Sequence, residues 1–179
     1  MLSFPGFCPI SPSGGSGTLP NLPPQNLTVA TTGASGSIFL RHFLQAVESD
    51  RRIQTANFIA SDSGLRVIAE ELGLRGRSDL IGQVLGRAQA PRKIQQQSNS
   101  DIGANVASGS YPADAMVIIP CSMGTLARIA NGIASHLIER EAEVLRNKPF
   151  VYNVDAAQPR RGMMQVGCTR CGDIVADQT

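Results

Sequence analysis

The chain has 179 residues, a formal net charge of +2 and four cysteines. This length suits one domain with a three-layer core. The near-neutral charge excludes the concentration of basic residues typical of nucleic-acid binders. No apolar run reaches the length of about 20 residues that spans a bilayer. With no signal-peptide pattern at the start, we expect a cytoplasmic protein that binds no nucleic acid and has no membrane span.

The first 25 residues are rich in Pro, Gly and Ser, and six of them are prolines. Such a composition does not support regular structure. It predicts a disordered leader, with an overlong choice of start site as the alternative. The folded domain is therefore expected to begin near Asn26.

The segment that organises the chain is Asn26–Ile38, an apolar run that ends in a turn between two glycines. Apolar residues recur at helical spacing beyond it, which predicts a strand, a loop and a helix. Such a loop leaves the first N–H groups of the helix free for an anion, with phosphate as the leading candidate. Gly33 and Gly36 allow close approach of a ligand, and the serines at 35 and 37 offer hydroxyl donors. An ordinary turn capped by serine is the alternative.

A second strand is predicted over Arg51–Ile59, followed by a short polar loop and a helix that ends near Leu72. Ser61 then lies at the carboxyl end of a strand, where open α/β sheets place ligand contacts. Its other interpretation, a helix N-cap, is compatible with that role. The next region, Gly73–Asn105, shows no sustained period; it predicts a short helix at Leu80–Leu85 and an exposed loop at Gln95–Ser100.

The uninterrupted apolar run Ala115–Pro120 predicts a central parallel strand, which runs into a small polar loop and a helix reaching Ile133. This loop and the loop at 33–37 could together bind one ligand. Cys121 is interpreted as a packing residue rather than a nucleophile. His42 and His136 fall within helical stretches and are not expected to form a catalytic pair. A further helix, Ser135–Leu145, and a strand, Phe150–Val154, complete an α/β fold.

Three blocks of sequence together resemble one family: TTGASGS, Ser61, and ASGSYPADAMVIIPCSMGTLARIANGIASHLIER. They look like the flavin prenyltransferases, the UbiX family of Rossmann-like (flavodoxin-like) FMN-binding flavoproteins, over about Val29–Val151. The resemblance implies a three-layer αβα fold with a parallel sheet and a homo-oligomer. It also implies transfer of a dimethylallyl group from dimethylallyl phosphate to reduced FMN, without a metal, in the service of a UbiD-type decarboxylase.

The same resemblance implies the site. Ser35 and, by position, Glu71 correspond to active-site residues. The FMN contacts it implies are Gly33, Ala34, Ser35, Ser61, Ser122, Met123, Gly124 and Thr125.

The sequence departs from the family after Val151. The arginine and glutamate that follow the last strand in the family have no match, and neither does the segment that holds the prenyl phosphate. We interpret residues 153–179 as a divergent tail beyond an FMN-binding flavoprotein domain at 26–152, and a tail out of frame is the hypothesis that we favour. The pair Cys168 and Cys171 has the spacing of half a zinc site, but no second pair follows. A non-catalytic FMN-binding homologue and a flavin-dependent decarboxylase relative therefore remain alternatives. Arg140 and Arg146 are the cations nearest to the lost segment, and Arg140 is expected to pair on the surface.

Overall fold

The computed structural model describes residues 25–74, 79–88 and 91–145, together with the backbone of residues 150–154. The predicted leader, apart from Gln25, lies outside the described residues. So do Arg146, the tail beyond Val154 and its two cysteines. Among the described residues, none of the helices has the length and apolar character needed to cross a membrane.

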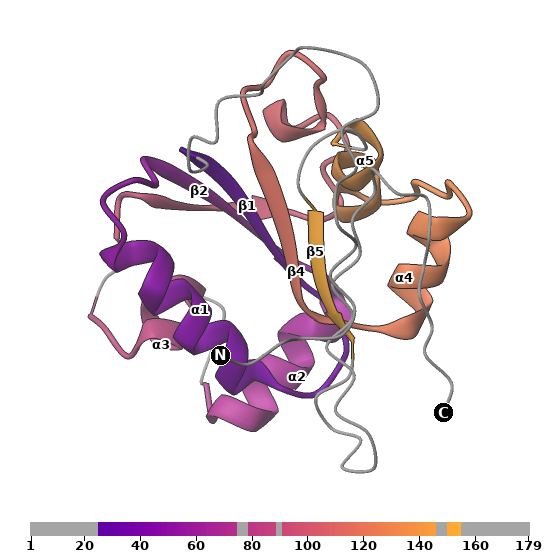
Figure 1. Ribbon diagram of the computed structural model, residues 1–179. Helices are drawn as coiled ribbons and strands as arrows, with labels where there is room; N and C mark the ends of the chain where they lie inside the picture. Colours follow the sequence, from indigo (N-terminus) through magenta and orange to yellow (C-terminus); the bar gives the residue numbers. More distant parts are fainter. Residues whose placement is uncertain (1–24, 75–78, 89–90, 146–149, 155–179) are drawn as a thin grey trace, which may run out of the picture.

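Five parallel strands form one sheet in the order β3-β2-β1-β4-β5 (Figure 1). The strands are β1 (Asn26–Thr31), β2 (Thr55–Ala60), β3 (Ile94–Ser98), β4 (Ala115–Cys121) and β5 (Phe150–Val154). This order matches the first five strands of the Rossmann order 3-2-1-4-5-6. The predicted parallel sheet is confirmed.

Helices cover both faces of the sheet (Figure 1). They are α1 (Ser37–Ser49), α2 (Asp62–Leu72), α3 (Leu80–Leu85), α4 (Met123–Ala130) and α5 (Leu137–Val144), with a 3₁₀ turn, η1, at Asn105–Ala107. Helices α1, α2 and α3 share one core with the sheet, and α4, α5 and η1 share another. The three-layer arrangement expected from the sequence is therefore present.

The buried strands anchor these two cores. Phe58 of β2 has no exposed surface and packs in the core with Leu40 and Leu44 of α1, whereas Met116 and Ile118 of β4 are equally buried in the core with α4 and α5. Burying one side chain of this size contributes about 1.5–3 kcal/mol. The prediction of a central strand at 115–120 is confirmed, since β4 pairs with β1 on one side and β5 on the other.

Three predicted boundaries or assignments were wrong. Gln95–Ser100 was expected to be an exposed loop, but β3 takes up residues 94–98 and pairs with β2. This strand lies at the edge of the sheet, where glutamine side chains remain in water and no apolar pattern is needed. Strand β2 begins at Thr55 rather than Arg51, and α4 ends at Ala130 rather than Ile133 because Gly132 adopts a positive φ of 69°.

The order of the strands in the sheet indicates where a ligand could bind. Strand β1 lies between β2 and β4, and the connections that leave its two neighbours run to opposite faces of the sheet. A crevice opens at the carboxyl ends of the strands at such a switch point. The loops after β1, β2 and β4 all end there.

Candidate functional site

The three loops at the switch point are fixed to one another by hydrogen bonds. The Ser61 N–H donates to the Thr31 carbonyl at 3.0 Å, which joins the ends of β2 and β1. Thr32 connects β1 to the loop after β4, because its N–H donates to the Pro120 carbonyl at 3.0 Å and its Oγ1 accepts from the Ser122 N–H at 2.6 Å. Residues far apart in the sequence therefore meet at one rigid edge.

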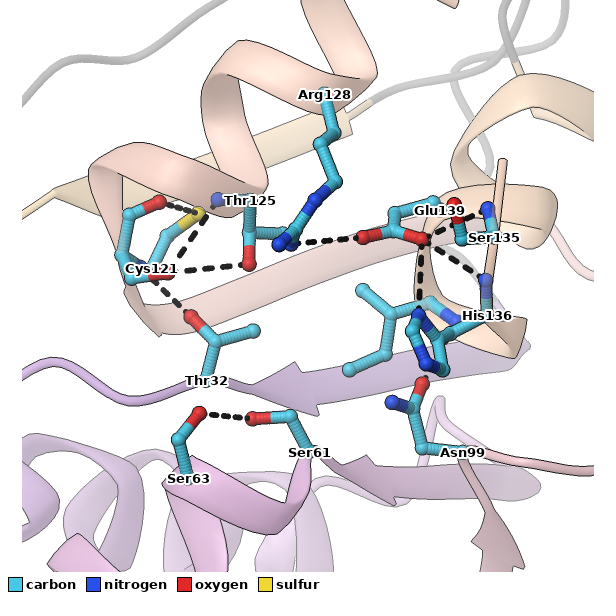
Figure 2. A network of polar contacts seen from close by, with 12 residues as sticks. Thr32, Ser61, Ser63, Asn99, Cys121, Thr125, Arg128, Ser135, His136 and Glu139 are labelled. Carbon is cyan, nitrogen blue, oxygen red and sulfur yellow. Dashed lines mark hydrogen bonds and ion pairs between the residues drawn. The ribbon is translucent and has the colours of Figure 1, made fainter. Parts of the chain in front are cut away.

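Ser61 and its loop form one side of the site. Ser61 caps α2 through a 3.0 Å hydrogen bond from the Gly64 N–H to its Oγ, so the predicted N-cap is confirmed. Its hydroxyl lies 3.1 Å from that of Ser63, as Figure 2 shows. Gly33 packs so closely against Ser63 that an added Cβ would lie 2.6 Å from the Ser63 Cβ and Oγ atoms. The sequence therefore needs glycine at this position for packing.

Ser122 and α4 form the opposite side. Ser122 caps α4, accepting from the Thr125 N–H at 3.3 Å, and the two hydroxyl groups lie 3.1 Å apart. The N–H groups of the first helical turn have no acceptor within an α-helix, so those of Met123 and Gly124 face the end of the helix. A Cβ added to Gly124 would meet nothing within 4 Å. Open space, hydroxyls and a positive helix end are thus combined at the start of α4.

A cavity of about 710 Å³ lies between these two sides. Ser61, Ser122, Gly124 and Thr125 all line it, although they come from two separate loops of the chain. Its volume falls within the range of about 300–1,000 Å³ found for small-molecule sites. The remaining sequence-predicted residues, Gly33, Ala34, Ser35 and Met123, are not part of its lining, and the Met123 side chain is exposed.

Ser35 and Glu71 form a second cluster, in a separate pocket of about 510 Å³. The Ser35 hydroxyl donates to the Glu71 Oε1 atom at 2.5 Å, and the Ser37 N–H donates to Oε2 at 2.6 Å. The Gly36 N–H lies within 3.1–3.2 Å of both oxygens. The start of α1 was predicted to bind phosphate, but a carboxylate of the chain itself accepts these hydrogen bonds.

The environment of Glu71 favours its charged form. Partial burial acts to raise its pKa, but the hydrogen bonds from Ser35, Ser37 and Gly36 outweigh burial and lower the pKa to about 2. Glu71 therefore carries a negative charge at neutral pH, at the positive end of α1. Gly36 has a positive φ of 117° and provides no side-chain cap, so Glu71 takes the capping role that a serine was expected to fill.

A charged network on the wall of the cavity was missed by the sequence interpretation (Figure 2). The Arg128 Nη1 atom of α4 lies 3.2 Å from Oε1 of Glu139, whose side chain is only 4% exposed. Glu139 Oε2 accepts from the N–H groups of Ser135, at 3.0 Å, and His136, at 2.9 Å. The available signal was the spacing of Arg128 three residues after Thr125, which places both on one helical face.

His136 lies just before α5 rather than within a helix, which corrects the sequence prediction. It lines the cavity with its Nδ1 atom 3.5 Å from Glu139. Asn99, which follows β3, closes the same end of α5: its carbonyl accepts from the Leu137 N–H at 3.0 Å and its Oδ1 from the Ile138 N–H at 3.2 Å. The far wall of the cavity is thus built by two helices and the loop after β3.

Two further expectations concern residues without a role in the cavity. Cys121 is fully buried, and burial raises the pKa of its thiol to about 12, which suits a packing residue and not a thiolate nucleophile. Arg140 forms an exposed ion pair with Glu143, with 2.7 Å between the Arg140 Nη1 and Glu143 Oε2 atoms, so the predicted surface pairing is confirmed.

Comparison with known proteins shows the family of this chain. The sequence profile of the family described as "Flavoprotein" matches residues 17–159, which is most of the chain. The chain belongs to the flavoprotein family. A relative from Alkalihalophilus pseudofirmus, named flavin prenyltransferase UbiX, is 36% identical over 121 residues, which cover 66% of this chain and 58% of the relative. The resemblance to this family found in the sequence is confirmed.

Solved structures of flavoproteins share the fold. The crystal structure of AnUbiX (PadA1) in complex with FMN and dimethylallyl pyrophosphate is 26% identical with a TM-score of 0.58; the match covers 73% of this chain and 63% of that one. A dodecameric FMN-dependent UbiX-like decarboxylase from Escherichia coli O157:H7 is 27% identical with a TM-score of 0.61, over 74% of this chain and 67% of that one. The chain spans just over half the length of the curated relative.

Proposed function

We propose that this flavoprotein binds FMN in the cavity between Ser61 and Ser122, with the phosphate of FMN at the start of α4. The observation that supports this placement is the state of the two candidate helix ends. Glu71 already accepts the hydrogen bonds at the start of α1, whereas the start of α4 faces a cavity lined by hydroxyls. A phosphate needs N–H and O–H donors that no other group occupies and a positive helix end, and of these two positions the start of α4 meets that need.

The reaction proposed for the site is transfer of a dimethylallyl group from dimethylallyl phosphate to reduced FMN. Bound reduced FMN would supply the nucleophile of that reaction. The chain's own groups would position the reactants, because the hydroxyls of Ser61, Ser122 and Thr125 would orient FMN in the cavity. The proposal also includes assembly as a homo-oligomer, which the dodecameric neighbour supports. It further includes supply of the product to a UbiD-type decarboxylase, which the family resemblance implies.

A second candidate is an FMN-binding homologue that does not catalyse prenylation. It is favoured by the sequence after Val151, which lacks the arginine and glutamate that follow the last strand in the family. A phosphate leaving group needs positive charge nearby, and the family segment that supplies it has no counterpart in the sequence. A flavin-dependent decarboxylase relative remains a further alternative, because one structural neighbour bears that description.

Binding of FMN and riboflavin tests the proposed position of the phosphate. If the start of α4 holds it, FMN should bind at least about tenfold more tightly than riboflavin, a difference of about 1.4 kcal/mol. The variant Gly124→Asp places a negative charge in open space, so it should abolish that preference, while the uncharged variant Gly124→Asn should largely retain it. Equal affinities of the unchanged protein for the two flavins would contradict the proposal.

Activity separates the two candidates. Incubated with reduced FMN and dimethylallyl phosphate, the 179-residue chain should form little prenylated flavin, and a chimera carrying a family-type C-terminal segment should form it readily. The mass and absorbance of the flavin report the product. Efficient prenylation by the chain itself would show that a family-type C-terminal segment is dispensable.

A further inference from the structure

Arg128 stands out among the cavity residues because of its charge. Acidic side chains at Asp62 and Glu139 also line the cavity, and His136 is ionisable. Among the described lining residues, Arg128 alone carries a permanent positive charge. Its side chain is 49% exposed, and Figure 2 shows it descending from α4 toward Glu139 on the side of the helix that carries Thr125.

The Arg128 guanidinium has more N–H donors than its contact with Glu139 uses. Among the described residues, Arg128 makes one side-chain hydrogen bond, from Nη1 to Glu139 at 3.2 Å. A guanidinium has five N–H groups in a planar fork. This contact directs the side chain toward Glu139 and uses one of its five N–H groups. The remaining N–H groups are free to meet an oxyanion in two parallel hydrogen bonds.

Glu139 does not cancel the positive charge that Arg128 offers. Its carboxylate is buried, and Oε2 accepts two backbone hydrogen bonds, from Ser135 and His136, at the positive end of α5. Much of its charge is therefore balanced by α5 itself. Glu139 contacts one Nη atom of the guanidinium, and Arg128 also lines the cavity.

We propose that Arg128, positioned by Glu139, binds a phosphate monoester dianion in the cavity. The proposal rests on the proposed function, since it takes the cavity to hold a phosphate-bearing ligand. Two ligands of that reaction carry this group, namely FMN and dimethylallyl phosphate. Arg128 would supply positive charge that the sequence interpretation sought at Arg140 and Arg146, and its position on α4 does not depend on the C-terminal segment.

The test compares Arg128→Gln with Arg128→Lys and with a matched control, Arg140→Gln, which removes an arginine outside the cavity. Flavin binding is followed by fluorescence quenching, and binding of dimethylallyl phosphate to the FMN-loaded protein by calorimetry. If the dianion belongs to FMN, Arg128→Gln weakens FMN binding at least about tenfold and leaves riboflavin binding unchanged. If it belongs to dimethylallyl phosphate, the ratio of flavin affinities is unchanged and dimethylallyl phosphate binding falls by a similar factor.

In either case Arg128→Lys should recover part of the loss, because it keeps the charge but not the fork, and Arg140→Gln should behave as the unchanged protein. A folded Arg128→Gln variant that binds both phosphate ligands normally would overturn the proposal while leaving FMN binding intact. If the unchanged protein binds no flavin, the proposed function fails instead. Inorganic phosphate titrated into the flavin-free protein then decides on Arg128 alone: weaker binding in Arg128→Gln supports the proposal, and equal or absent binding overturns it.

Discussion

Glu141 gives the protein an expected dependence of stability on pH. The residue lies on α5 with no exposed surface; its Oε1 accepts from the Thr28 hydroxyl of β1, and its Oε2 has no partner among the described residues. Burial raises the pKa of this carboxyl to about 7, although the hydrogen bond from Thr28 acts in the opposite direction. In the unfolded chain the same group titrates near its ordinary value of 4.5.

The sign and size of the effect follow from these two values. Between pH 4.5 and 7 the folded protein holds a proton on Glu141 that the unfolded chain has released, so the free energy of unfolding falls as the pH rises. The stabilisation by the protonated Glu141 is fully present below pH 4.5 and is lost as the pH rises through about 7. The difference between 4.5 and about 7 corresponds to about 3 kcal/mol, a large part of the stability of a domain of this size.

The variant Glu141→Gln tests this reasoning, because an amide cannot ionise and retains an oxygen that accepts from Thr28. Urea denaturation followed by circular dichroism should give similar stabilities near pH 4.5 and a variant up to about 3 kcal/mol more stable at pH 8. The control Glu143→Gln changes an exposed carboxylate of the same helix and should show no such divergence. The reasoning is refuted if the difference between Glu141→Gln and the unchanged protein is the same at both pH values.

Three further outcomes are expected. Gly33→Ala should destabilise the protein by about 1–3 kcal/mol, since the new Cβ lies 2.6 Å from Ser63 atoms, and adding Ser63→Gly should restore stability in thermal unfolding. Cys121 should resist iodoacetamide at neutral pH until the protein unfolds, as judged by mass mapping of its peptide; rapid native labelling would show that the thiol is accessible. Glu71→Gln should destabilise the protein above pH 4.5, and the difference should shrink as the pH falls toward 2, because the carboxylate hydrogen-bonded to Ser35 stabilises only while it is charged; an unchanged difference in acid would contradict this.

Much of the fold could be predicted because each signal involved was local. The apolar run of β4 and the cap at Ser61 depend on a few consecutive residues, and the structure has them where the sequence predicts them. Strand β3 was not predicted, because an edge strand with glutamines in water shows neither alternation nor an apolar run. Its only strong signal is its pairing with β2, which is not a property of the segment itself.

The site was predicted in part for the same reason. The cavity brings together Ser61 and Ser122, because the carboxyl ends of parallel strands meet at one edge of the sheet, but the loop at 33–37 that was expected to join Ser122 does not line it. The capping of α1 by Glu71 could not be read from the loop, since the carboxylate comes from 34 residues beyond Ser37. The pairing of Arg128 with Glu139 similarly requires knowing how α4 and α5 pack.

The two hydrogen bonds that Asn99 accepts from the start of α5 have a consequence for the energetics of binding. They join the end of an edge strand to a helix on the opposite side of β1, and this connection is made by the chain alone. Ordering a loop when a ligand arrives costs about 0.5–1.5 kcal/mol for each side chain immobilised. Here that entropy is lost when the protein folds, so the wall formed by Asn99 and α5 is preorganised, and a ligand that fits it keeps more of its contact energy as affinity.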